Sequence, residues 1–221
     1  MSRATCTPDS GADCWHATRT AAGYNEPMSG SDRMKPVTPG LKLTYEDFAL
    51  FPDDGKRHEI VDGEHHVTPS PNTKHQTIVG NLHGVMWAYL QRQPLGRVFV
   101  APFDVVFSEF DIVEPDLLYL SSERAAEIIT PQHVRGAPEL VVEVASPSTR
   151  QRDETIKRRL YERSGVSEYW VVDPDLDLVR IYRRSGESFS RAIELSREAD
   201  DVLTTPLLPE LEIPLTGIFR Q

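Results

Sequence analysis

The sequence predicts an α/β fold, and three observations carry the prediction. Two runs, ELVVEVA at 139–145 and EYWVVD at 168–173, are too apolar to be half exposed, so we expect interior strands of a sheet covered on two faces. A helix is expected between them, which makes a right-handed strand–helix–strand unit in one sheet. With 221 residues and 39% hydrophobic residues, the chain can build one such core and has little room for two.

The N-terminal segment has a different composition. Residues 1–39 are rich in Ser, Thr, Gly, Pro and Asp and show no apolar periodicity, so we predict a disordered extension, followed by a single domain at 40–221. Cys6 and Cys14 lie in this extension, which argues against a disulfide framework, and His16 nearby adds only a weak zinc signal. No apolar run reaches the roughly 18 to 20 residues that span a bilayer, and no signal pattern opens the chain. We therefore expect a cytoplasmic protein without a membrane segment.

The first part of the domain shows clear turn and helix signals. Thr44 with Asp47 three residues later predicts the start of a short helix that ends by Pro52. RHEIVDGEHHV, from residue 57, predicts two strands joined at a tight Asp62-Gly63 turn. A long helix follows PSPN and closes before Pro94. Its expected apolar stripe consists of Ile78, Leu82, Val85 and Tyr89, widened by Val79, Met86 and Leu90.

The middle of the domain leads to the strand–helix–strand unit. We expect strands at 97–108 and 116–120, separated by an acidic turn, EFDIVEP, at 109–115. In the following helix, Ser148 and Gln151 form a capping-box pattern, Ile156 and Leu160 are expected to be buried, and Gly165 is placed to end the helix.

The C-terminal part completes the sheet. The segment 178–184 is expected to pair with 168–173 through the PDLD turn, and 189–195 extends the edge. The tail at 206–219 is expected to cover the sheet with its Leu, Ile and Phe side chains. Trp170 and Tyr169 are interpreted as core and rim aromatic residues rather than as a base-stacking platform.

Three residues form the candidate chemical site: Asp116 at the start of a strand, Glu143 inside the next one, and Lys157 on the helix after it. Two neighbouring carboxylates repel one another, and a shared divalent cation with oxygen ligands is an economical compensation. Mg²⁺ or Mn²⁺ held by Asp116, Glu143 and the Val144 carbonyl fits this pattern. The competing interpretations are a strand-entry role for Asp116 and a buried salt bridge from Glu143 to an arginine.

Lys157 also has two interpretations. Asp153 lies four residues before it, which is typical of an exposed ion pair on a helix surface. Alternatively, its side chain extends over the strand ends, where the ammonium would orient an attacking water and neutralise charge that develops on a phosphoryl group.

The charge distribution limits the expected contacts with nucleic acid. A formal net charge of −10 argues against a broad electrostatic grip on DNA. One basic cluster lies near the candidate site. Solvated helix surface is the default for such charges, but Arg150, Arg152 and Arg158 are candidates for contacts with phosphates. The whole cluster is Arg150, Arg152, Arg158, Arg159 and Arg163.

The string PDLLYL at 115–120, followed by GAPELVVEVASPSTRQRDETIKRRLYERSGVSEYWVVDP at 136–174, closely resembles the Uma2 family of restriction-endonuclease-like proteins. This family is a branch of the PD-(D/E)XK nuclease superfamily. The likeness extends upstream to HEIVDGEHHVTPSPNTKHQTIVGNL at 58–82 and covers the chain from Leu41 to the C-terminus.

The resemblance implies a restriction-endonuclease-like mixed sheet flanked by helices and a Mg²⁺-dependent endonuclease that cuts DNA with metal-activated water. Asp116 and Glu143 match the two acidic motif positions. The superfamily pattern expects Lys two residues after Glu143, where this chain has Ala145, and Lys157 resembles a migrated replacement.

Glu59 and His75 match recurring family positions as a third acid or as substrate contacts. Their alternatives are a surface pair of Glu59 with Arg57 or Lys56, and a helix cap for His75.

Three hypotheses remain open from the sequence. The first is the DNA endonuclease. The second is a catalytically inactive binding or assembly module that kept the fold, which the acidic net charge and the lack of a separate DNA-reading domain favour. The third is a metal-dependent phosphodiesterase for another substrate, because a site defines chemistry more firmly than it defines substrate. A homodimer is expected only by analogy with small nucleases that address two strands.

Overall fold

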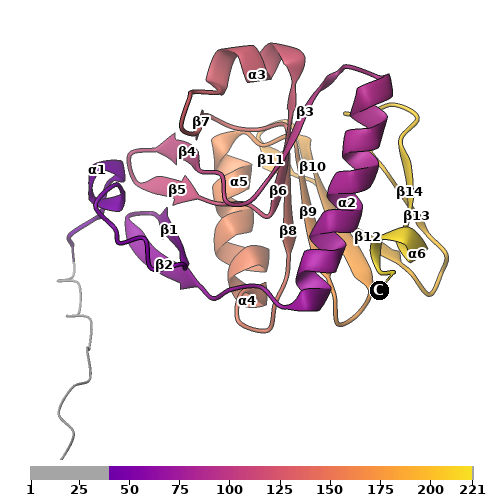
Figure 1. Cartoon of the computed structure of the whole chain (residues 1–221), viewed down its shortest axis with the longest axis horizontal. Helices are drawn as coiled ribbons and strands as arrows, with labels where there is room; N and C mark the ends of the chain where they lie inside the picture. Colours follow the sequence, from indigo (N-terminus) through magenta and orange to yellow (C-terminus); the bar gives the residue numbers. More distant parts are fainter. Residues whose placement is uncertain (1–39, 221) are drawn as a thin grey trace, which may run out of the picture. The chain divides into compact units, whose positions relative to one another are not determined.

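The structure is a computed structural model, and it describes residues 40–220 (Figure 1). The predicted extension at 1–39, with Cys6, Cys14 and His16, lies outside the described residues. None of the helices in the described part of the chain combines the length and the apolar character needed to cross a membrane.

A seven-stranded mixed sheet lies at the centre, in the order β11-β10-β9-β8-β6-β3, with β12 beside β10. β8 and β9 are parallel, and the other neighbours are antiparallel. Every residue of β8 and β9 is buried, which confirms both predicted interior strands. The strands are β3 (Gly96–Val100), β6 (Leu117–Ser121), β8 (Leu140–Val144), β9 (Glu168–Asp173), β10 (Leu178–Ser185), β11 (Ser188–Phe189) and β12 (Ile193–Ser196).

Helices cover both faces of this large sheet. Figure 1 shows α2 (Thr73–Arg92) on one side and α5 (Arg158–Ser164) on the other. Leu140, Val142 and Val144 of β8 pack in one apolar cluster with α2 and the C-terminal tail, while Val141 packs in a second cluster with Leu160 and Tyr161 of α5. Alternate residues of a strand point to opposite faces, so each face of β8 receives its own core. The predicted packing of the tail is confirmed.

A five-stranded sheet, in the order β2-β1-β5-β4-β7, packs against the α5 side. Its first hairpin turns at Asp62 and Gly63, whose φ angles of 54° and 79° place both residues in the left-handed region that tight hairpin turns need. The strands are β1 (Arg57–Val61), β2 (Glu64–Thr68), β4 (Val105–Ser108), β5 (Asp111–Val113) and β7 (Val134–Arg135). The helix α5 therefore has apolar contacts with both sheets.

Short elements complete the described chain. The Thr44 side chain and Asp47 form the predicted capping box at the start of α1. The helices are α1 (Tyr45–Phe48), α3 (Ser122–Ile128), α4 (Arg150–Arg152) and α6 (Leu215–Ile218), with the π-helical turn η1 (Asp153–Lys157) between α4 and α5. A two-stranded sheet joins β13 (Val202–Thr204) and β14 (Glu212–Pro214).

Some expected elements differ from the structure. The acidic segment 109–115 is not a turn throughout, because Asp111–Val113 is a buried strand, β5. The helix α3 was not expected. In α2, Val85 is 39% exposed and His75 is buried instead, so the buried stripe begins one turn earlier than the apolar residues alone indicate.

The helix after β8 differs most. The expected capping box of Ser148 and Gln151 is absent from the described contacts, because Thr149 is the N-cap and makes no side-chain cap. Ile156, expected in the core, is 39% exposed, and Lys157 is buried in its place. The amide of Arg158 bonds to the Asp153 carbonyl five residues back, so the backbone forms a wide π-helical turn. This turn places a lysine, and not the isoleucine, against the sheet.

The glycine that ends α5 allows a test of how much its left-handed backbone conformation contributes to stability. Gly165 has φ of 93°, as predicted for a helix-ending glycine, and a Cβ there would meet nothing within 4 Å. We expect Gly165→Ala to lower the free energy of unfolding by about 1 kcal/mol, because an L side chain disfavours the left-handed region. Gly165→Asn, which tolerates this region better, should cost less. Urea denaturation measures both, and equal stability of Ala and Asn variants would contradict the explanation.

Candidate active site

Asp116 and Glu143 lie on the same face of the large sheet. Leu118 and Val141 point into the core beside α5, and alternation along each strand puts Asp116 and Glu143 on that face as well. Both are buried, with 3% and 2% of their surface exposed. The Val144 amide donates a 2.8 Å hydrogen bond to Asp116 Oδ2, which fixes this carboxylate beside the end of β8.

Lys157 lies between two buried carboxylates. Its Nζ is 2.9 Å from Glu143 Oε1 and 2.7 Å from Glu59 Oε1, and only 1% of the residue is exposed. Tyr161 also donates a 2.6 Å hydrogen bond to Glu143 Oε1. The surface pair with Asp153 is therefore wrong, because Asp153 is buried too and its carboxylate lies beyond ion-pair distance of Lys157.

Glu59 forms an ion pair with the Lys157 ammonium, which lies between Glu59 and Glu143. It lies on β1 and is fully buried, and its Oε2 is 3.2 Å from Arg152. The alternative of a surface pair with Arg57 or Lys56 is wrong, since Lys56 pairs with the side chain of Asp54. Glu59 does not line the neighbouring cavity, and its role as a third acid or as a substrate contact stays a prediction.

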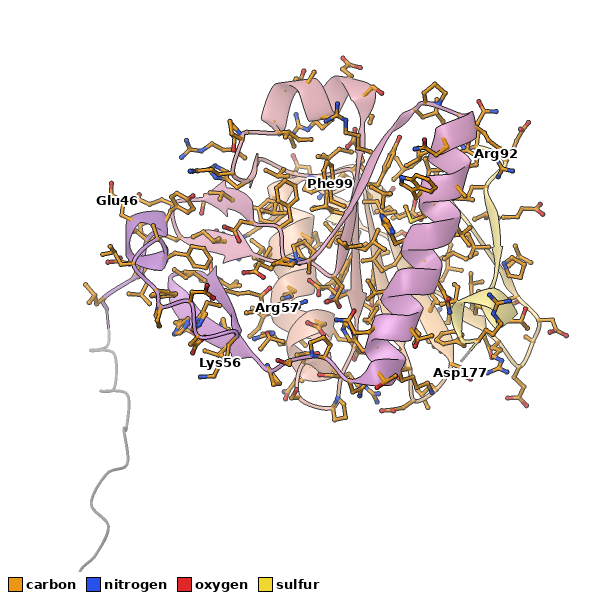
Figure 2. All side chains as sticks on the ribbon, viewed as in Figure 1. Glu46, Lys56, Arg57, Arg92, Phe99 and Asp177 are labelled. Carbon is orange, nitrogen blue, oxygen red and sulfur yellow. The ribbon has the colours of Figure 1, made fainter. Side chains whose placement is uncertain are left out.

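Both oxygens of the Asp116 carboxylate already have side-chain partners. Arg57 Nη1 is 2.6 Å from Oδ1, and His75 Nε2 is 3.1 Å from Oδ2 (Figure 2 labels Arg57 on β1). The helix cap expected of His75 as an alternative belongs to Asn72, whose side chain accepts a hydrogen bond from the His75 amide. The arginine neutralisation considered for Glu143 thus occurs at Asp116 instead.

A cavity of about 230 Å³ opens onto these groups. Asp116, Glu143 and Lys157 line it together with His75, Arg57 and Asp153. Its remaining walls come from the segment that enters α2, 68–72, and from the loop after β8, 145–149. The three central residues of the predicted site, Asp116, Glu143 and Lys157, are therefore gathered at one cavity.

The pKa values reflect crowding of the carboxylates. Burial raises the pKa of Glu143 to about 7, and the nearby carboxylates of Asp116 and Asp153 add to the rise while Lys157 opposes it. Burial also acts to raise the pKa of Asp116, but hydrogen bonds from His75 and Arg57 lower it to about 2. At Glu59, Lys157 and Arg152 outweigh burial and lower the pKa. The site therefore holds more carboxylates than its cations fully compensate.

Asp153 and Arg57 are site residues that the sequence reasoning missed. Asp153 Oδ1 is buried without a hydrogen-bond partner in the described part of the chain, and burial raises the pKa of its carboxyl. The sequence signal for Arg57 is its position two residues before Glu59, a candidate site residue. Residues two apart on a strand point to the same face of the sheet, so Arg57 would be expected on the side of Glu59. For Asp153 the signal is the four-residue spacing to Lys157, which is typical of a helix surface but here joins two buried residues.

The five arginines of the predicted basic cluster lie in different places in the structure. Arg152 lines the cavity and pairs with Glu59, whereas Arg150 does not line it and pairs with Asp173 and Asp175. Arg158 does not line it and stacks on the Tyr182 ring. The other two arginines lie elsewhere: Arg163 pairs with Asp62 and Asp111, and Arg159 is exposed. The five arginines therefore do not gather at the cavity, and contacts of Arg150, Arg152 and Arg158 with phosphates stay a prediction.

The carboxylate oxygens of Asp116 and Glu143 suit a hard divalent cation such as Mg²⁺, provided that one existing contact is broken. Within residues 40–220 no three metal-binding side chains form a ready cluster, so most ligands would be waters, which Mg²⁺ commonly retains. Glu143 Oε2 has no hydrogen-bond partner among these residues, and the excess of carboxylates favours added positive charge. The condition is that Asp116 releases Arg57. The Val144 carbonyl stays a predicted ligand, since the structure shows only the role of its amide.

Comparisons with known proteins agree with this architecture. The model of the family Uma2, described as "Putative restriction endonuclease", matches residues 45–216. A crystal structure of "a putative nuclease belonging to DUF820 from Anabaena variabilis" has a TM-score of 0.68 at 21% identity and covers 80% of this chain and 97% of that chain. At this identity the likeness shows the fold, and it confirms the expected restriction-endonuclease-like mixed sheet with flanking helices.

A second solved structure is too dissimilar to support any conclusion about this chain. The type IIG restriction endonuclease BpuSI matches with a TM-score of 0.35 at 13% identity, over 66% of this chain and 15% of that chain. No curated protein matches the chain.

The raised pKa of Glu143 predicts a pH dependence of stability in metal-free protein. Between pH 4.5 and about 7 the folded state keeps a proton that the unfolded state has lost, so the free energy of unfolding should fall as pH rises through this window. Glu143→Gln removes this titration while keeping an acceptor for Lys157. We expect the wild type to lose up to about 3 kcal/mol relative to the variant across the window. Urea denaturation with EDTA at several pH values measures it, and parallel pH profiles would refute it.

Proposed function

The chain belongs to the Uma2 family of restriction-endonuclease-like proteins, and on this premise we propose that it is a Mg²⁺- or Mn²⁺-dependent endonuclease that hydrolyses phosphodiester bonds of DNA. The family relation supports a nuclease, and this family generally uses divalent metals. The specific metal, the DNA substrate and the residue roles below are parts of the proposal.

One observation carries the proposal: two buried carboxylates share a sheet face with a buried ammonium at the wall of a cavity. Asp116 immediately precedes β6, Glu143 lies on the neighbouring strand β8, and Lys157 reaches Glu143 from the helix beyond. Buried ionisable groups are costly unless they are paired or serve a function. Here the carboxylates exceed what a structural ion pair needs, since the hydrogen bonds of Glu143 within the described residues all go to Oε1.

The proposed metal ligands are Asp116, Glu143 and the Val144 carbonyl. A bound Mg²⁺ or Mn²⁺ supplies Lewis acidity, which activates water and stabilises charge on a phosphoryl oxygen. Asp116 and Glu143 provide hard oxygen ligands from fixed backbone positions, and Arg57 has to leave Asp116 before a cation can bind there. Asp153, at the same cavity wall, adds negative charge that attracts the cation.

Lys157 acts as a cation in this proposal and not as a base. Burial acts to lower its pKa, but the carboxylates of Glu143 and Glu59 outweigh burial and raise it. The amine therefore stays protonated at neutral pH, where it donates hydrogen bonds to an attacking water and neutralises charge that develops on the phosphoryl group. Glu59 and Tyr161 position this network through Lys157 and Glu143 respectively.

A second candidate function is a nuclease-fold binding module without turnover. The observation that favours it is the pairing of Arg57 with Asp116 at 2.6 Å, because the charge of this acid is balanced without a metal. In this alternative the buried ion pairs fix the arrangement of the two sheets and have no chemical role. Metal binding separates the two candidates.

We expect the wild type to nick supercoiled plasmid DNA in the presence of Mg²⁺ or Mn²⁺ and to lose this activity with EDTA. Glu143→Gln and Lys157→Met should each lower the rate about a hundredfold or more, because each removes charge needed in the transition state. Glu123→Gln on the exposed surface of α3 is the matched control and should retain full activity. Equal nicking by all four proteins would indicate a contaminating nuclease and contradict the proposal.

Isothermal titration with Mn²⁺ tests the binding-module alternative. The nuclease should take up Mn²⁺ in a manner that Asp116→Asn and Glu143→Gln abolish, and bound metal should raise the melting temperature of the wild type only. An absence of heat and of thermal stabilisation in the wild type would favour the binding module.

A further inference from the structure

We propose that Arg57 is a displaceable counter-ion of Asp116, which a divalent cation replaces and which then binds a backbone phosphate of the nucleic acid. This inference rests on the proposed function and adds to it a substrate-binding residue and a coupling between metal and substrate. It explains why Asp116, a proposed metal ligand, forms an ion pair with Arg57 in the metal-free protein.

The two oxygens of Asp116 are held in different ways. Oδ2 accepts hydrogen bonds from the Val144 amide at 2.8 Å and from His75 at 3.1 Å, and the amide belongs to a buried strand that cannot move away. Oδ1 is held by the Arg57 side chain at 2.6 Å. A metal ion at Asp116 therefore gains access through Oδ1, and Arg57 is the group that must leave.

Arg57 is also the cation of the site that is best able to leave. Lys157 is almost fully buried between two carboxylates, and Arg152 is held by Glu59 and by a 2.6 Å bond to Thr68. The Arg57 side chain retains 19% exposure, and its buried Nε has no hydrogen-bond partner within the described residues. Its guanidinium thus holds Asp116 by one nitrogen and leaves most of its donors unused.

A second cavity lies beside the first and offers space for the Arg57 side chain once it has left Asp116. This cavity, of about 210 Å³, shares Arg57, His75 and Asp116 with the first one and extends along α2 to His83. The guanidinium stands in the wall common to both cavities. If it leaves Asp116, its planar set of donors faces space where a phosphate next to the scissile bond would lie, and this geometry suits phosphate oxygens.

The exchange couples two binding events. A metal that occupies Asp116 frees Arg57 for phosphate, and a phosphate that attracts Arg57 frees Asp116 for metal. Because such coupling is reciprocal, each ligand strengthens binding of the other by the same factor. Without substrate, Arg57 weakens metal binding.

Mn²⁺ affinity tests the inference directly, with free Mn²⁺ measured by electron paramagnetic resonance. Without nucleic acid, Arg57→Met should bind Mn²⁺ about tenfold more tightly than the wild type, because the competitor is gone. Arg152→Met is the matched control, since it removes one positive charge from the same cavity without freeing Asp116, and it should tighten binding less. A phosphorothioate oligonucleotide, whose backbone resists hydrolysis, should strengthen Mn²⁺ binding by the wild type and less so by Arg57→Met.

Two results would overturn the inference: Mn²⁺ affinity of Arg57→Met no higher than that of the wild type, or equal tightening by Arg152→Met. Either leaves the proposed function intact as long as the wild type binds Mn²⁺ through Asp116 and Glu143. A wild type that binds no Mn²⁺ defeats both proposals.

If Arg57→Met does not fold, the Nε–H resonance of Arg57 in wild-type protein titrated with Mg²⁺ gives a second measurement. A large shift or faster exchange with water is expected, and an unchanged resonance at saturating Mg²⁺ refutes the displacement.

Discussion

The burial of the Lys157 ammonium between Glu59 and Glu143 is the contact on which the arrangement of the site depends. It joins three separate elements: β1 of the five-stranded sheet, β8 of the seven-stranded sheet, and the π-helical turn before α5. Removing one member of a buried ion pair leaves an uncompensated charge, which typically costs several kcal/mol. The same contact that keeps Lys157 protonated also fixes its distance from Glu143, one of the proposed metal ligands.

The charge balance at rest explains how such a site can exist in a folded protein without metal. Lys157 and Arg152 compensate Glu59, Arg57 compensates Asp116, and Glu143 shares Lys157 while its pKa rises toward neutrality. Glu59 and Asp116 thus have cationic partners, whereas Glu143 shares its cation with Glu59. The arrangement is stable enough to persist, but it stores negative charge that a dication would satisfy better than single cations can.

Much of the fold and the three central residues could be predicted from the sequence, because strand patterns and an acid within an apolar run are local signals. Asp116, Glu143 and Lys157 do meet at one cavity. The sequence could not show that Lys157 replaces Ile156 in the core, since this depends on one π-helical turn and not on apolar periodicity. Nor could it show the partner of Arg57, because pairing across 59 residues is a property of the tertiary structure.

The division of the site between two sheets has a consequence for its durability. The hairpin β1–β2 brings Arg57 and Glu59, whereas the deeply buried β8 brings Glu143. Hairpins at the margin of a fold open by subglobal fluctuations that cost less than complete unfolding. On heating, detachment of this hairpin would break the ion pair of Arg57 with Asp116 and those of Glu59 with Lys157 and Arg152, while the central strands remain assembled. Thermal inactivation would then precede melting, and the opened hairpin would be an early target for proteases.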